Sequence, residues 1–216
     1  PFQIDDVELL FAGLSPLNAL IPAPYQRFVS QLGQYGPGQE IRGWERHKQT
    51  QFQMTATKLF GPNNFLGADQ IAVVGEVGFN KTQLPDNLRF QGDGTDTSGG
   101  YDVLTGAGRN PITQVKGFPT DFSWGYRIAA RADYNNAFGS AFTVSPRVAF
   151  NHDVHGITPG PGGSFIEGRK SVTLGAEATY LNNLGLDLSY TSFFGAGNLN
   201  LIGDRDFVSV AVKYSF

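Results

Sequence analysis

The sequence predicts an all-β fold of long antiparallel strands, and three observations support this prediction. Apolar and polar residues alternate over segments much longer than the strands of about 5–6 residues common in soluble proteins. The chain ends on an aromatic residue that closes such a segment. No stretch reaches the roughly 20 consecutive apolar residues of a membrane-spanning helix. Long alternating strands are typical of a transmembrane β-barrel, which turns one face to lipid and the other to a wet interior.

The net charge and the residue composition argue against several classes of function. The formal net charge is -3 at pH 7, which argues against a nucleic-acid partner because such a partner calls for a basic patch. The chain has no cysteine, so it has no disulfide, no thiolate metal site and no cysteine nucleophile. It begins at Pro1 without a signal peptide, and we expect it to belong to a longer polypeptide.

The last segment, residues 206–216, alternates most clearly. One face is wholly apolar and is formed by Val208, Val210, Val212, Tyr214 and Phe216. The other face carries small or polar side chains, namely Ser209, Ala211, Lys213 and Ser215. Soluble domains usually end in frayed, polar residues, so an apolar strand with a terminal aromatic favours a membrane strand.

Six further segments are predicted to be strands, approximately 42–60, 70–81, 121–134, 138–154, 171–180 and 186–191. Pro146 interrupts one of them and predicts a local bulge, because proline cannot donate to the ladder. Aromatic residues gather near the strand ends of the apolar faces, as in the girdles of membrane barrels. They are Phe122, Trp124, Tyr134, Phe138, Phe150, Tyr180, Tyr190, Phe207, Tyr214 and Phe216.

The connections alternate between short and long. Residues 135–137 and 182–183 form tight turns and 61–69 a moderate one, whereas 82–120, 155–168 and 195–205 are long. Membrane barrels place short turns on the periplasmic side and long loops outside. Residues 41–216 then form about seven strands, the C-terminal portion of a larger, even-stranded barrel whose N-terminal strands are missing. Residues 1–40 form an extracellular loop, in which 4–12 can make a short helix with Val7, Leu10 and Phe11 on one face.

Two resemblances support this interpretation. The terminal pattern from Val208 to Phe216 resembles the assembly signal of bacterial outer-membrane barrels, which implies the barrel-assembly machinery as a partner. Three further stretches resemble an uncharacterised proteobacterial barrel family, DUF1302. They are Gly43-Trp44-Glu45-Arg46, then Gln51, Gln53 and Thr57-Lys58-Leu59-Phe60-Gly61, and Glu76-Val77-Gly78. Members of that family are larger than this chain and tend to accompany inner-membrane transporters of the resistance-nodulation-division type. The resemblance implies traffic of hydrophobic molecules or lipids and supplies no catalytic or ligand residues.

Charged residues on the polar faces are the candidates for lining the lumen. They are Arg127, Arg131, Asp133, Arg147, Glu177 and Asp187. The hairpin near Asn136 is expected to place Arg127 and Arg147 at about the same height. A basic cluster in a narrow lumen would favour anions. The alternative is a salt-bridge network that fills a polar interior.

The sequence gives less support for a metal site or for an enzyme active site. His152 and His155 are expected on opposite faces of a strand, so they do not suggest a metal site, and we predict no metal or cofactor. No Gly-x-Ser-x-Gly motif occurs, and Ser145 and His152 also face apart. We therefore expect the chain not to be an enzyme.

The expected function is passage or export of small or hydrophobic, lipid-like solutes across the bacterial outer membrane. The alternatives are an outer-membrane enzyme such as a lipid hydrolase, and a structural or surface-recognition barrel without transport. The expected partners are outer-membrane lipid, the assembly machinery, the missing N-terminal strands and an inner-membrane transporter system, without nucleic acid.

Overall fold

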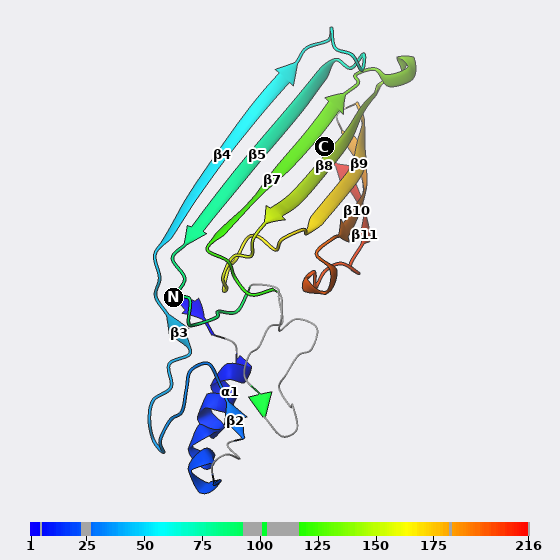
Figure 1. Cartoon of the computed structure of the whole chain (residues 1–216). Helices are drawn as coiled ribbons and strands as arrows, with labels where there is room; N and C mark the ends of the chain where they lie inside the picture. Colours follow the sequence, from blue (N-terminus) through cyan, green and yellow to red (C-terminus); the bar gives the residue numbers. More distant parts are fainter. Residues whose placement is uncertain (5, 23–26, 93–100, 103–116, 182, 216) are drawn as a thin grey trace.

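The computed structural model describes residues 1–4, 6–22, 27–92, 101–102, 117–181 and 183–215. Seven antiparallel strands form one sheet in the order β11-β10-β9-β8-β7-β5-β4, which curls like a trough (Figure 1). The strands are β4 (Gln49–Phe60), β5 (Gln70–Thr82), β7 (Phe122–Asp133), β8 (Phe142–His155), β9 (Lys170–Tyr180), β10 (Leu184–Phe194) and β11 (Phe207–Tyr214). The all-β class is confirmed. β4 and β11 are the two edges of this sheet.

Short and long connections lie at opposite ends of the sheet (Figure 1). The β4–β5, β7–β8 and β9–β10 turns lie at one end, here called the turn end. The long connections lie at the other, here called the loop end, and include η3 (Gly197–Leu199) between β10 and β11. One predicted boundary was wrong. Residues 138–140, expected in a strand, belong to the β7–β8 turn, where η2 (Ala137–Gly139) holds Phe138 at φ 56°.

The strand register confirms the alternation of faces. Gly75, Ile128, Phe150 and Val172 stand opposite one another in a row across β5, β7, β8 and β9. The adjacent row, one residue away in each of these four strands, consists of Glu76, Arg127, Asn151 and Ser171. The first row belongs to the apolar face of the sheet and the second to the polar face.

Large apolar side chains are exposed on the apolar face, whereas several small polar side chains are buried on the polar face. On the apolar face, Ile128 is 47% exposed and Leu174 is 55% exposed, although both lie in inner strands. On the polar face, Ser145 is only 2% exposed, and Arg131 on β7 reaches Glu177 on β9 across β8. Side chains that converge over an intervening strand indicate that the polar face is the concave one.

Aromatic rings gather toward both ends of the apolar face. Phe79 stacks on Trp124 with centroids 5.8 Å apart near the loop end, and Phe142 contacts Tyr180 at 4.8 Å near the turn end. Phe207 departs from the prediction, because it pairs with Thr191 and so lies on the polar face.

The predicted bulge at Pro146 is wrong. The β7–β8 register is the same on both sides of it, with Arg131 opposite Arg147 and Tyr134 opposite Val144. The irregularity lies instead near the loop end, where Trp124 and Gly125 stand opposite His155 and Asp153. Val154 is therefore the extra residue of a β-bulge.

The remaining elements lie beyond the loop end (Figure 1). They are β1 (Phe2–Gln3), α1 (Asp6–Leu14), η1 (Ser15–Leu20), β2 (Phe28–Val29), β3 (Trp44–Glu45) and β6 (Tyr101–Asp102). β3 pairs with β1, so the segment 42–60 is not one strand as predicted. Phe2, Ile4 and Phe90 form a small core here.

The helix expected over 4–12 occurs two residues later, but its faces differ from the prediction. Leu10 is exposed, whereas Glu8 is buried. Glu8 Oε2 accepts hydrogen bonds from Ser30 Oγ at 2.7 Å and from the Gln31 N–H at 3.0 Å, which offset part of the cost of burying the carboxylate, whereas Oε1 is buried without a hydrogen-bond partner in the described structure. Among the described residues, no helix is long and apolar enough to cross a membrane.

Candidate functional site: the polar face of the sheet

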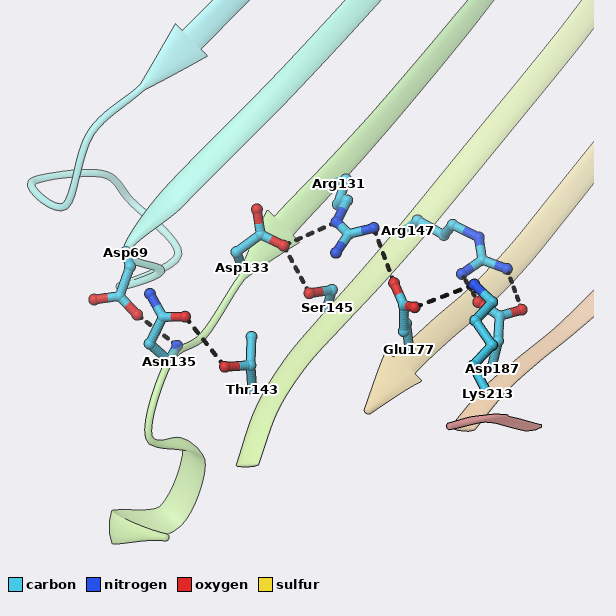
Figure 2. Close-up of polar contacts among 10 residues, drawn as sticks. All are labelled: Asp69, Arg131, Asp133, Asn135, Thr143, Ser145, Arg147, Glu177, Asp187 and Lys213. Atoms are coloured by element: carbon cyan, nitrogen blue, oxygen red, sulfur yellow. Dashed lines mark hydrogen bonds and ion pairs between the residues drawn. The ribbon is translucent and has the colours of Figure 1, made fainter. Parts of the chain in front are cut away.

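Arg147 on β8 reaches across β9 to Asp187 on β10 (Figure 2). Its two terminal nitrogens donate to the two Asp187 oxygens at 2.5 and 2.8 Å, a bidentate arrangement that fixes the guanidinium. On β9, which lies between these two strands, Gly175 stands opposite Arg147 on one side and opposite Ser189 of β10 on the other. A Cβ on Gly175 would lie 3.0 Å from Arg147 Cζ, so the absence of a side chain makes room for this contact.

Arg131 connects a second set of polar groups. Its Nε donates to Asp133 at 2.8 Å, and its Nη1 donates to Glu177 at 3.2 Å. Ser145 Oγ also donates to Asp133, at 2.6 Å, and Lys213 on β11 donates to Glu177 at 3.4 Å (Figure 2). We call these seven residues the turn-end network: Arg131, Asp133, Ser145, Arg147, Glu177, Asp187 and Lys213.

The formal charges of the turn-end network balance. Three cationic side chains face three carboxylates, and the ion pairs connect β7 with β9, β8 with β10, and β9 with β11. Arg131 and Arg147 stand directly opposite each other, where like charges repel, and each points to a carboxylate. For these two arginines the geometry matches the salt-bridge alternative.

Arg127 lies apart from this network. The expectation that it aligns with Arg147 is wrong, because η2 lengthens the β7–β8 turn and Arg147 aligns with Arg131 instead. Arg127 stands between Glu76 on β5 and Asn151 on β8. Within the described part of the chain, the Arg127 side chain makes no hydrogen bond and no ion pair, with Glu76 or with any other residue.

A cavity of about 160 Å³ adjoins Arg127 on the polar face. Its polar lining includes Gln51 and Gln53 of β4, Glu76 and Arg127. Phe165, from the connection between β8 and β9, also lines it. We call this cavity the loop-end pocket. Sequence reasoning missed Phe165 and both glutamines as members of one site.

Two glycines accept the Phe165 ring. Gly78 on β5 and Gly125 on β7 stand opposite each other on the polar face. A Cβ on Gly78 would lie 3.3 Å from Phe165 Cζ, and one on Gly125 would lie 2.9 Å from Phe165 Cε1. Glycine within a strand often marks a close approach of another part of the chain, and that signal was present in the sequence.

Asp153 anchors the β8–β9 loop over this position. Its Oδ2 accepts from the Ile166 N–H at 3.1 Å and from Arg169 Nε at 2.8 Å. The Phe165 N–H donates to Thr158 Oγ1 at 3.1 Å. The loop is thus held against the concave face by side-chain and backbone hydrogen bonds.

The model of a family described as a protein of unknown function, DUF1302, matches residues 1–216. This chain belongs to the DUF1302 family. No curated protein and no solved structure matches it. Four residues that carried the sequence resemblance to DUF1302 gather at one place in this structure. Gln51, Gln53, Glu76 and Gly78 all line the loop-end pocket.

The histidines of this DUF1302 chain are arranged differently from the prediction. The bulge at Val154 places both His152 and His155 on the side of Tyr126 and Trp124, not on opposite faces. Their partners nevertheless differ: His152 contacts Tyr126, and His155 Nδ1 lies 3.0 Å from Glu167. In the described ranges, no three His, Asp or Glu side chains are grouped to hold a metal ion.

The residues of the assembly pattern occupy an edge strand. Val208, Val210, Val212 and Tyr214 of β11 alternate on the apolar face and are all exposed. Phe216 lies outside the described residues.

Proposed function

We propose that this chain forms part of a bacterial outer-membrane β-barrel that passes small or hydrophobic, lipid-like solutes. One observation carries the proposal: long strands present an exposed apolar face on one side and a concave, charged face on the other. In water such an apolar face would be an aggregation hazard. In a membrane it would face lipid, and the polar face would surround a wet lumen.

The strand directions support closure by further strands. β4 and β11 both run from the loop end to the turn end, so they are parallel to each other. An antiparallel barrel can then close only if an odd number of strands is inserted between them, which makes the total even. We propose that N-terminal strands of the same polypeptide supply them, because an open edge in lipid leaves backbone groups without partners.

The proposed orientation follows the lengths of the connections. The turn end would face the periplasm, and the loop end would lie outside with residues 1–40. The exposed β11 would be the strand recognised by the barrel-assembly machinery. An inner-membrane transporter system of the resistance-nodulation-division type would supply or receive the solute.

One observation favours the structural alternative, a barrel with a filled interior. The turn-end network is balanced in charge and spans the polar face from β7 to β11. If the missing strands add groups of the same kind, the interior would be closed. The enzyme alternative gains no such support, because Ser145 donates to Asp133 while His152 lies on the other face.

The membrane part of the proposal is tested by a matched pair of variants in the full-length polypeptide. Ile128→Arg places a charge on the apolar face and should cost about 2–4 kcal/mol near the bilayer midplane. Ala129→Arg, its neighbour on the polar face, should cost far less. Reversible unfolding in lipid vesicles measures both, and equal losses would contradict a lipid-facing apolar side.

The transport part needs a separate measurement. Full-length protein reconstituted into vesicles should speed the exchange of a small amphiphile relative to empty vesicles. Vesicles with the Ile128→Arg variant, which should insert poorly, serve as the control. A folded, inserted protein without any flux would favour the filled structural barrel.

A further inference from the structure

We propose that the loop-end pocket binds a zwitterionic head group, with the anionic part on Arg127 and the cationic amine between Glu76 and Phe165. The proposal deepens the proposed function, since it names a class of solute for the same lumen. Its starting point is that Arg127 and Glu76 are cross-strand neighbours on the polar face without an ion pair between them.

The charges at the pocket favour a zwitterion over a simple anion. The Glu76 carboxylate accepts only a long hydrogen bond from Thr55 Oγ1, at 3.3 Å, and the Arg127 guanidinium has no hydrogen-bond or ion-pair partner among the described residues. Asp153 is already neutralised by Arg169. One cation and one anion therefore remain, and a ligand with both charges would satisfy both.

The shape of the pocket supports the same class. The planar guanidinium of Arg127 carries several N–H donors, whose geometry suits phosphate or carboxylate oxygens. An ammonium beside Glu76 would also lie near the Phe165 ring, and aromatic faces attract such cations. Gln51 and Gln53 add amides that can donate or accept hydrogen bonds. The cavity of about 160 Å³ has room for a small polar group, so an attached alkyl chain would extend outside it.

The test uses head groups without alkyl chains, so that partition into detergent does not interfere. Calorimetric titration of the full-length protein in maltoside micelles would compare glycerophosphocholine, glycerol phosphate and choline. We expect glycerophosphocholine to bind at least about tenfold more tightly than either singly charged compound. Equal or tighter binding of glycerol phosphate, or binding of none of the three, would overturn the proposal.

Variants assign the binding to this pocket. Arg127→Gln should weaken glycerophosphocholine binding by about tenfold or more, and Glu76→Gln should weaken it while leaving glycerol phosphate binding no weaker. Arg131→Gln is the matched control, because Arg131 lies on the same strand and face but belongs to the turn-end network. An equal effect of Arg131→Gln would mean that general charge, not the pocket, governs binding.

Phe165→Leu provides a readout that does not depend on a charged variant. It should reduce the affinity for glycerophosphocholine more than that for glycerol phosphate, and an equal reduction would contradict the role of the ring. The outcomes also separate the two proposals. Binding without vesicle flux would retain the pocket and refute transport, whereas flux without head-group binding would refute the pocket alone.

Discussion

Toward the turn end of the polar face, Arg131 is held by Asp133 and Glu177 and Arg147 by Asp187, whereas farther from that end the Arg127 side chain has no hydrogen-bond or ion-pair partner in the described structure. Arg127 and Arg131 belong to the same strand, and all three arginines lie on the polar face. They differ in whether a carboxylate lies within reach of the guanidinium. Arg147 finds Asp187 two strands away, while Arg127 and its neighbour Glu76 remain separate.

Glycine serves the two regions in different ways. Under the turn-end network, Gly175 lets a side chain of the sheet lie across a strand. Under the loop-end pocket, Gly78 and Gly125 let a ring from a loop rest on the sheet. The first arrangement connects strands and fills space, and the second leaves a pocket with unpaired charges. We infer that the turn-end network stabilises the sheet and that the loop-end pocket is free to bind a solute.

For this comparison of the two regions, the largest expected effect concerns these glycines. Gly175→Ala should destabilise the fold by about 1–3 kcal/mol, because its Cβ would meet Leu188 O at 3.0 Å and Ser189 Cβ at 2.9 Å, neither of which can move freely. Gly78→Ala should cost less, because the atom it meets is the tip of the Phe165 ring. Unfolding midpoints in denaturant measure both.

Gly185→Ala is the control for both variants. It lies on the same face of β10, and its Cβ would meet Lys213 Cβ at an ordinary 3.7 Å. The Gly185→Ala variant should be as stable as the unsubstituted protein or slightly more stable, because glycine weakens a strand interior. If Gly78→Ala proved the most damaging of the three, the pocket rather than the network would be the structural part of the polar face.

A smaller effect is expected from removing single charges. Asp187→Asn should lower stability, because it leaves Arg147 with only a neutral acceptor. Arg127→Gln should change stability by no more than about 0.5 kcal/mol, because its side chain has no hydrogen bond or ion pair to lose in the described structure. Thermal unfolding of the two variants side by side measures this contrast, and equal losses would show that Arg127 is part of the structural framework.

The smallest effect concerns Asp206, an acid that pairs with no arginine in the described part of the chain. Asp206 precedes β11, and hydrogen bonds from the Phe193 N–H and from the Ser192 and Tyr190 hydroxyls lower the pKa of its carboxyl group. A lowered pKa stabilises the folded state above the ordinary carboxyl range, and this contribution is lost as the pH falls through the lowered value. Below about pH 4, the amide of Phe193 should therefore lose hydrogen-exchange protection, after correction for the intrinsic rate.

Asp206→Asn is the comparison for that experiment. The variant should lack the pH-dependent part of the protection, because its side chain does not titrate in this range. A pH dependence that persists in Asp206→Asn would assign the effect to another group.

Local alternation was enough to predict the seven strands and the face of each charged residue. Side chains alternate with period two wherever a strand is extended, so the parity of Arg127, Arg131, Arg147 and Glu177 follows from the sequence alone. The terminal pattern ending in Tyr214 and Phe216 could be recognised for the same reason. These features depend on neighbours along the chain and not on distant contacts.

Tertiary structure decided how the strands pair and what covers them. The extended β7–β8 turn set Arg147 opposite Arg131, and the bulge at Val154 moved His155 to the side of His152. Only the folded β8–β9 loop brought Phe165 onto Gly78 and Gly125. Register and loop placement depend on contacts between residues far apart in sequence, and a period-two pattern carries no information about which residue stands opposite which.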